Sequence, residues 1–159
     1  WLPQETILYD GAALSRTTRA EIAEDAELVL LDLLVLGRIA MGEEVRRLTL
    51  TDRREVWRGA RPVLIDPVAL TAGDLARPDP SGLAGARAVG ALHLIAADAE
   101  DRLARLRNLL PGDGSAAASA WDGRLSARFL ARDPAALRAV LARALPGLTG
   151  RPLPRVWPR

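Results

Sequence analysis

The longest apolar run of the sequence, Leu28–Leu36, contains a single polar residue, Asp32, and constrains the fold more than any other stretch. A segment that spans a bilayer needs roughly 20 apolar residues, so this run predicts burial inside a protein and no membrane segment. A short run without a polar face is typical of a central strand that is covered on both sides. Periodicity alone leaves a buried helix open as the alternative.

Short strands separated by glycines are predicted throughout the first half of the chain. They cover residues 5–9, 14–22, 27–36, 45–51, 55–58 and 63–70. Leu48 and Leu50 alternate with threonine and arginine, which is the pattern of a strand with one solvent-facing side. Closely spaced strands with turn residues between them favour antiparallel, stacked β-sheets. We therefore expect residues 1–75 to form a strand-rich part.

The pattern changes after a linker rich in proline and glycine at residues 76–85. The segment that follows, residues 86–159, is predicted to contain a strand, a helix, a hairpin, a second helix and an extended tail. The expected elements are residues 88–96, 98–110, 116–121 with 125–131, and 134–145. This order predicts two helices on one face of a small sheet, and so a β-dominated α+β fold with both helices in the C-terminal half.

Local signals define the ends of these C-terminal elements. Asp98 is a suitable N-cap for the first helix, and Asp133 followed by a proline is suitable for the second. Pro146 and Gly147 are expected to end the second helix. The dipeptide of residues 122–123, Asp-Gly, favours a two-residue hairpin turn.

Composition excludes several kinds of chemistry. The chain of 159 residues is 49% hydrophobic, which suffices for a core and excludes disorder. Its 22 basic residues, all arginine, and 20 acidic residues leave a charge of +2, too balanced for a protein that coats nucleic acid. There is no cysteine, and the single histidine, His93, lies among apolar residues, where we expect a structural or partner-facing role. Catalytic triads, tight metal cages and a tightly bound cofactor are therefore not predicted.

Three polar features remain as candidate functional sites. They are Gln4, Glu5 and Asp10 around the first strand; Arg38, Met41, Glu43 and Glu44 in the glycine-flanked loop 37–44; and Trp157 in the proline-rich tail 151–159. Glycines let the loop turn tightly at the end of the apolar strand, so its charged groups are presented at a sheet end. The alternative, that all of these are turn and surface groups, stays open.

Four strings in the sequence carry a family resemblance. They are WLPQETILYDGA (1–12), LVLGRIAMGE (34–43), SAWDG (119–123) and GRPLPRVW (150–157). In content, order and spacing they closely resemble the urease accessory protein UreD family, also called UreH, of which the chain resembles the C-terminal portion. Because it starts within a strand pattern, we expect a missing beginning, and with it an exposed sheet edge and apolar patch in the fragment.

The resemblance implies a non-enzymatic maturation factor of the cytoplasm. UreD-like proteins associate with the accessory proteins UreF and UreG, the latter a GTPase, and bind the urease apoprotein, to which nickel is delivered. The family is thought to pass nickel through an internal passage, and carboxylates suit such transit because they release the ion readily. We expect Glu5 and Glu43 to be weak transit ligands near this passage, with Asp10 and Glu44 close by and Arg38 paired with a carboxylate.

Two other functional classes are weighed against this one. A small hydrolase or transferase would use Glu5, Asp10 or Glu43 as a paired acid and base, although no catalytic motif accompanies them. A plain oligomerising β module would bind acidic partners through its arginines. Binding to urease components would distinguish the maturation factor from the plain module, and substrate turnover would favour the enzyme.

Overall fold

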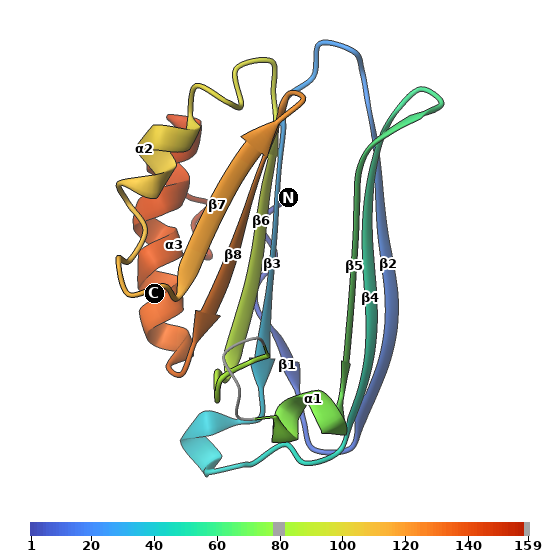
Figure 1. The fold of residues 1–159 in the computed structure, drawn as a ribbon, viewed down its shortest axis with the longest axis vertical. Helices are drawn as coiled ribbons and strands as arrows, with labels where there is room; N and C mark the ends of the chain where they lie inside the picture. The colour runs from blue at the N-terminus through green and yellow to red at the C-terminus, as the bar shows by residue number, and fades with distance from the viewer. Residues whose placement is uncertain (78–81, 158–159) are drawn as a thin grey trace. The chain divides into compact units, whose positions relative to one another are not determined.

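The computed structural model describes residues 1–77 and 82–157, and Figure 1 shows its course. Its elements in chain order are β1 (Thr6–Leu8), β2 (Ala12–Ile22), β3 (Leu28–Leu36), η1 (Ile39–Met41), β4 (Leu48–Arg58), β5 (Arg61–Thr71), α1 (Ala72–Ala76), β6 (Ala88–Ile95), α2 (Leu103–Arg107), β7 (Ala116–Trp121), β8 (Arg124–Ala131) and α3 (Pro134–Thr149). The predicted fold class, β-dominated with two sheets, is confirmed. Within the described residues, no helix combines the length and the apolar character needed to cross a membrane.

The chain forms two compact units, each assembled from separate segments. Unit 1 comprises residues 1–6, 27–34 and 86–159, and unit 2 comprises residues 7–26 and 35–85. Most of the five-stranded sheet belongs to unit 1, and the three-stranded sheet belongs to unit 2. Residues 78–81 of the predicted linker lie outside the described residues.

Unit 2 is built on a sheet with the strand order β2-β4-β5. The β4–β5 pair is antiparallel as expected, whereas β2 and β4 run parallel. The parallel pair arises because the chain leaves this sheet after β2, forms β3 in the other sheet, and returns as β4.

Strand β4 corrects the prediction of two separate strands at residues 45–51 and 55–58. The charged residues between them are part of one strand, in which the side chains of Asp52 and Arg54 are buried. Arg16 Nη2 lies 2.6 Å from Asp52 Oδ2, and Arg54 Nε lies 3.1 Å from Asp66 Oδ2. The charged residues that suggested a turn between two strands are thus buried inside the sheet, because neighbouring strands supply their counter-ions.

Unit 1 is built on the sheet β1-β3-β6-β8-β7, with α2 and α3 lying on one face of it (Figure 1). The apolar run forms the inner strand β3 between β1 and β6, which settles its assignment as a strand. Asp122 and Gly123 have φ values of 54° and 68°, so the predicted tight hairpin turn is confirmed.

The helices differ from prediction at their ends. Helix α3 begins as expected, with the Asp133 side chain accepting a hydrogen bond from Ala135 N. It does not stop at Pro146 but continues to Thr149, because Leu148 extends the buried face and Gly150 supplies the left-handed C-terminal cap. The other helices are short.

Helix α2 occupies only Leu103–Arg107 of the predicted 98–110, since the preceding segment is tied to the hairpin turn instead. Ala96 N donates to Gly123 O at 3.0 Å, and Glu100 Oε1 accepts from Gly123 N at 3.0 Å. Helix α1 was not predicted, although Thr71 and Asp74 form a capping box that the sequence contains.

Candidate functional site

The predicted site residues gather around two hydrogen-bonding centres, one in each unit. In unit 2, the carboxylates of Asp10 and Glu43 form what we call the acid hub. In unit 1, the guanidinium of Arg138 on α3 forms what we call the arginine hub. The structure thus brings Asp10, Arg38 and Glu43 together, and separately Gln4, Glu5 and Trp157.

Glu43 holds the glycine-flanked loop to the turn after β1. Its Oε1 accepts from Asp10 N at 3.2 Å, and its Oε2 accepts from both the backbone N and the side-chain Nε of Arg38, each at 2.9 Å. The Arg38 side chain, followed by these amides, lowers the pKa of Glu43 to about 2. Glu43 is therefore ionised at neutral pH.

Asp10 fastens the other end of the loop in the same way. Its Oδ1 accepts from the backbone N of Arg46 and of Arg47, both at 2.8 Å, and its Oδ2 accepts from Arg47 Nη2 at 2.9 Å. The Arg46 amide and then the Arg47 side chain lower the pKa of Asp10 to about 2. The segment of residues 37–47 is consequently anchored at both ends by ionised carboxylates.

The anchored loop presents its other side chains to solvent. Met41 is 75% exposed, and the Arg38 guanidinium lies over the ring of Tyr9 at 4.9 Å from the ring centre. Glu44 pairs with Arg46 at 2.6 Å in an exposed ion pair. Of the predicted loop residues, Glu43 and Arg38 thus bind within the loop, whereas Met41 faces outwards.

The arginine hub joins three segments of unit 1. Arg138 donates to Gln4 Oε1 at 3.2 Å and Glu5 Oε2 at 2.7 Å from the N-terminal segment, and to the carbonyls of Val156 and Trp157 at 3.1 and 3.0 Å from the tail. Its guanidinium also lies over the Trp157 ring, 4.9 Å from the ring centre. Arg138 thus links the tail and the N-terminal segment to α3.

Trp157 also connects the tail to the N-terminal segment. Its side chain is buried, and its Nε1 donates to Leu2 O at 3.1 Å. Arg138 is not predicted from the sequence, because its partners lie more than a hundred residues away or in the tail and no local spacing indicates them. Its one visible signal is its place beside Leu137 on the apolar stripe of α3.

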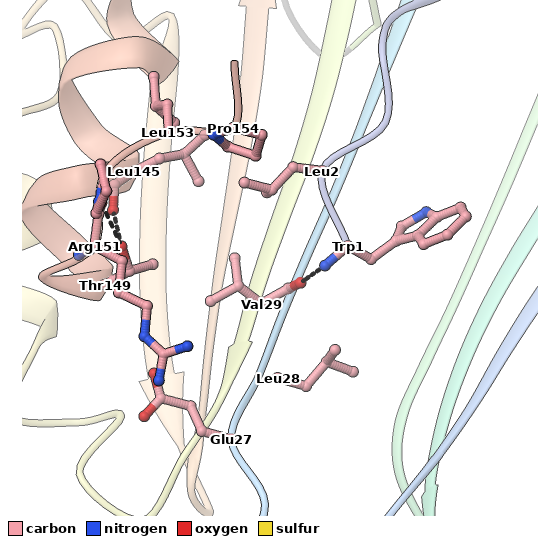
Figure 2. Close-up of a pocket in the computed structure, with 11 residues that line it drawn as sticks. Trp1, Leu2, Glu27, Leu28, Val29, Leu145, Thr149, Arg151, Leu153 and Pro154 are labelled. Carbon is pink, nitrogen blue, oxygen red and sulfur yellow. Dashed lines mark hydrogen bonds between the residues drawn. The ribbon is translucent and has the colours of Figure 1, made fainter. Parts of the chain in front are cut away.

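A pocket of about 300 Å³ lies in unit 1 beside this tail (Figure 2). Most of its lining is apolar, from Leu2, Val29, Leu145, Leu153 and Pro154 among others. Its acidic group, Glu27, already accepts from Arg102 at 2.8 and 3.1 Å. The pocket is therefore a small, largely apolar cavity whose charged lining side chains include Glu27 and Arg151.

The candidate metal and acid–base groups are divided between the two units. Among the residues that the structure describes, no three histidine, aspartate or glutamate side chains come together to hold a metal ion. Glu5 belongs to unit 1 and Glu43 to unit 2, and each is ion-paired with an arginine. His93 is buried, with Nδ1 2.9 Å from Ser126 Oγ.

Comparisons with known proteins agree on one family. The model of the UreD urease accessory protein family matches residues 1–158. The urease accessory protein UreD of Jannaschia sp. (strain CCS1) is 54% identical over 99% of this chain and 59% of its own length. The corresponding proteins of Methylobacterium sp. (strain 4-46) and Cereibacter sphaeroides are 51% and 46% identical, again over 99% of this chain and 58% of their own lengths. The chain thus spans about three-fifths of the length of these relatives.

Proposed function

The chain belongs to the UreD family of urease accessory proteins, and from that premise we propose that it acts in the cytoplasm as a non-enzymatic scaffold for urease maturation. The family match over residues 1–158 carries this proposal. In the proposed role the protein binds the urease apoprotein together with the accessory proteins UreF and UreG, and assists the insertion of nickel into urease.

Nickel is the cargo in this proposal, with Glu5 and Glu43 as weak ligands along its route. Glu5 Oε2 lies 2.7 Å from Arg138 Nη1, and Glu43 Oε2 lies 2.9 Å from Arg38 Nε. A nickel ion has to compete with a guanidinium at either carboxylate, and carboxylate oxygens bind nickel less tightly than imidazole or thiolate. Both features favour release of the ion over retention.

The competing enzyme hypothesis meets an electrostatic difficulty. General acid–base catalysis works best when the pKa of the acid lies near the operating pH. Asp10 and Glu43 both have a pKa of about 2, so neither carries a proton to donate at neutral pH. Their hydrogen bonds to amides and arginines suit a structural brace better than an acid and base pair.

Coexpression with urease tests the proposed function. The natural protein is produced with the urease subunits, UreF and UreG, and the nickel content and urea hydrolysis of the purified urease are measured. We expect both to fall several-fold without the protein, and also with Glu5→Gln or Glu43→Gln. Glu21→Gln is the matched control, because Glu21 is 71% exposed and pairs only with Arg19 among the contacts described.

Each outcome has a separate meaning. Full activation without the protein would overturn the maturation role. Full activation by the double variant, with Gln at positions 5 and 43, would remove these two carboxylates from the nickel route. Because Glu43 also braces the loop, co-purification of each variant with UreF and urease is measured in parallel. Loss of nickel with the complex intact supports transit, whereas loss of the complex assigns Glu43 to the loop alone.

A further inference from the structure

The braced loop of unit 2 has the properties of a docking surface. We propose that Tyr9 and residues 38–47 form a preorganised docking surface for a folded protein whose contact face has an apolar pocket bordered by carboxylates. The identity of that protein as a urease-maturation component rests on the proposed function, but the chemistry of the surface does not. The inference stands on three properties of the loop: order, exposed apolar side chains, and charge.

The loop is ordered although its apolar side chains are not buried. Glu43 and Asp10 hold it at both ends through backbone amides and arginines, and Gly42 closes η1 in the left-handed region at φ 67°. No residue of η1 is buried, so packing of its side chains does not explain this order. A loop fixed in advance loses less conformational entropy when a partner binds.

The side chains that the loop displays are those favoured at the centres of protein interfaces. Met41 is 75% exposed, Tyr9 49% and Ile39 37%. Tyrosine, methionine and arginine are enriched at such centres, and a single aromatic or aliphatic anchor often fills a pocket of the partner. Met41, projecting from a short turn of helix, fits the role of that anchor.

The charges of the loop determine the chemistry of the partner. The side chains of Arg46 and Arg47 are 79% and 78% exposed, and that of Arg38 is 54% exposed. The carboxylates that pair with Arg38 and Arg47 are much less accessible, at 15% for Glu43 and 27% for Asp10. Glu44, whose side chain is 72% exposed, pairs with Arg46, so the exposed surplus of positive charge comes from Arg38 and Arg47. That surplus beside the apolar centre is complementary to carboxylates on the partner.

A protein fits this surface better than a membrane does. An interfacial membrane anchor presents a wide apolar face, usually along a whole amphipathic helix. Here the apolar centre is a few side chains on one tight loop, and the Tyr9 ring is covered on one face by Arg38. A rigid projection of this size matches a preformed pocket.

Binding by purified components tests the surface. The natural chain is immobilised, and the urease apoprotein, UreF and UreG are applied one at a time while affinity is measured by biolayer interferometry. Met41→Asp is expected to weaken binding of one probe by about tenfold or more. Ile65→Asp is the matched control, because Ile65 is 40% exposed in the same unit but lies on β5. Arg46→Glu should weaken the same probe and reduce the salt dependence of its association.

The possible results distinguish this inference from the function on which it rests. If the unsubstituted chain binds none of the three probes, the proposed function is wrong, and so is the assignment of a urease-maturation protein as the partner of this surface. If it binds and Met41→Asp binds equally well, the docking surface alone is wrong. Loss of binding by Ile65→Asp as well would overturn the assignment to this loop. The same chain is finally tested against vesicles of anionic phospholipid. If it binds the vesicles but none of the proteins, and Met41→Asp abolishes that binding, the partner of this surface is a membrane and not a protein.

Discussion

The two hubs use opposite chemistry for the same task. In the acid hub of unit 2, the carboxylates of Asp10 and Glu43 accept hydrogen bonds from surrounding amides and guanidinium groups. In the arginine hub of unit 1, one guanidinium donates to surrounding carbonyls and to Glu5. Both hubs fix segments that lie outside the helices and strands and so lack the regular backbone hydrogen bonds of those elements. An arginine keeps its charge at all ordinary pH values, whereas a carboxylate does not.

The largest expected effect comes from removing the centre of the arginine hub. Arg138→Ala removes a donor from the Glu5 carboxylate and from the carbonyls of Trp157 and Val156, of which the Val156 carbonyl keeps Gln4 Nε2 as a donor. Hydrogen bonds that involve a charged group contribute about 1.5–3 kcal/mol each but are not additive, so we expect a loss of about 2–3 kcal/mol in the free energy of unfolding of unit 1. Urea denaturation measures this loss.

A second readout locates the effect in the tail. Arg155 and Val156 are already exposed, but release of the tail lets this segment adopt the extended conformation that trypsin binds. Trypsin should therefore cut after Arg155 faster in Arg138→Ala than in the unsubstituted protein. Arg143→Ala is the control, since Arg143 is an exposed residue of the same helix. Equal stability and equal cleavage in the two variants would show that Arg138 does not hold the tail.

An intermediate effect, dependent on pH, is expected at the acid hub. The folded pKa of Glu43 is about 2 against an ordinary 4.5, so its contribution to stability is fully present above pH 4.5 and is lost as the pH falls towards 2. Glu43→Gln should therefore melt at a lower temperature than the unsubstituted protein at pH 7, and the difference should shrink between pH 4.5 and 2. Asp10→Asn should behave alike, with its decline beginning near pH 3.8.

The same titration sharpens the contrast between the hubs. Backbone carbonyls do not titrate, so most of the difference between the unsubstituted protein and Arg138→Ala should persist at pH 3. Melting temperatures at pH 7, 4 and 3 for both variants compare the hubs directly. A pH-independent difference for Glu43→Gln would mean that its hydrogen bonds do not depend on its charge.

Sequence reasoning succeeded where the signal is local. The turn at Asp122–Gly123, the cap at Asp133 and the alternation around Leu50 each depend on neighbours within a few residues. Arg38 and Glu43, which lie five residues apart, also stood out within one glycine-flanked loop. These features follow from backbone geometry that a short stretch of chain determines by itself.

It failed where the partner is distant. The break wrongly predicted within β4 came from Asp52 and Arg54, whose counter-ions Arg16 and Asp66 lie on other strands. The parallel pairing of β2 with β4 depends on β3 joining a different sheet, which no local pattern encodes. Arg138 was missed for the same reason, because its place on the apolar stripe of α3 does not identify acceptors elsewhere in the chain.

The smallest expected effect separates the members of the arginine hub. Gln4 accepts from Arg138 Nη1 at 3.2 Å and donates through Nε2 to Val156 O at 3.1 Å, and its side chain is exposed. Gln4→Ala should therefore cost only about 0.5–1 kcal/mol, the net value of an ordinary hydrogen bond. In the Arg138→Ala background the cost should be smaller still, since the bond between Gln4 and Arg138 is already lost and the released tail no longer holds the Val156 carbonyl beside Gln4. A double-mutant cycle in urea measures this coupling.

Strict additivity in that cycle would show that the two contacts are independent and that the hub is a set of separate bonds. A coupling of the expected sign would show that Arg138 and Gln4 hold the tail as one unit.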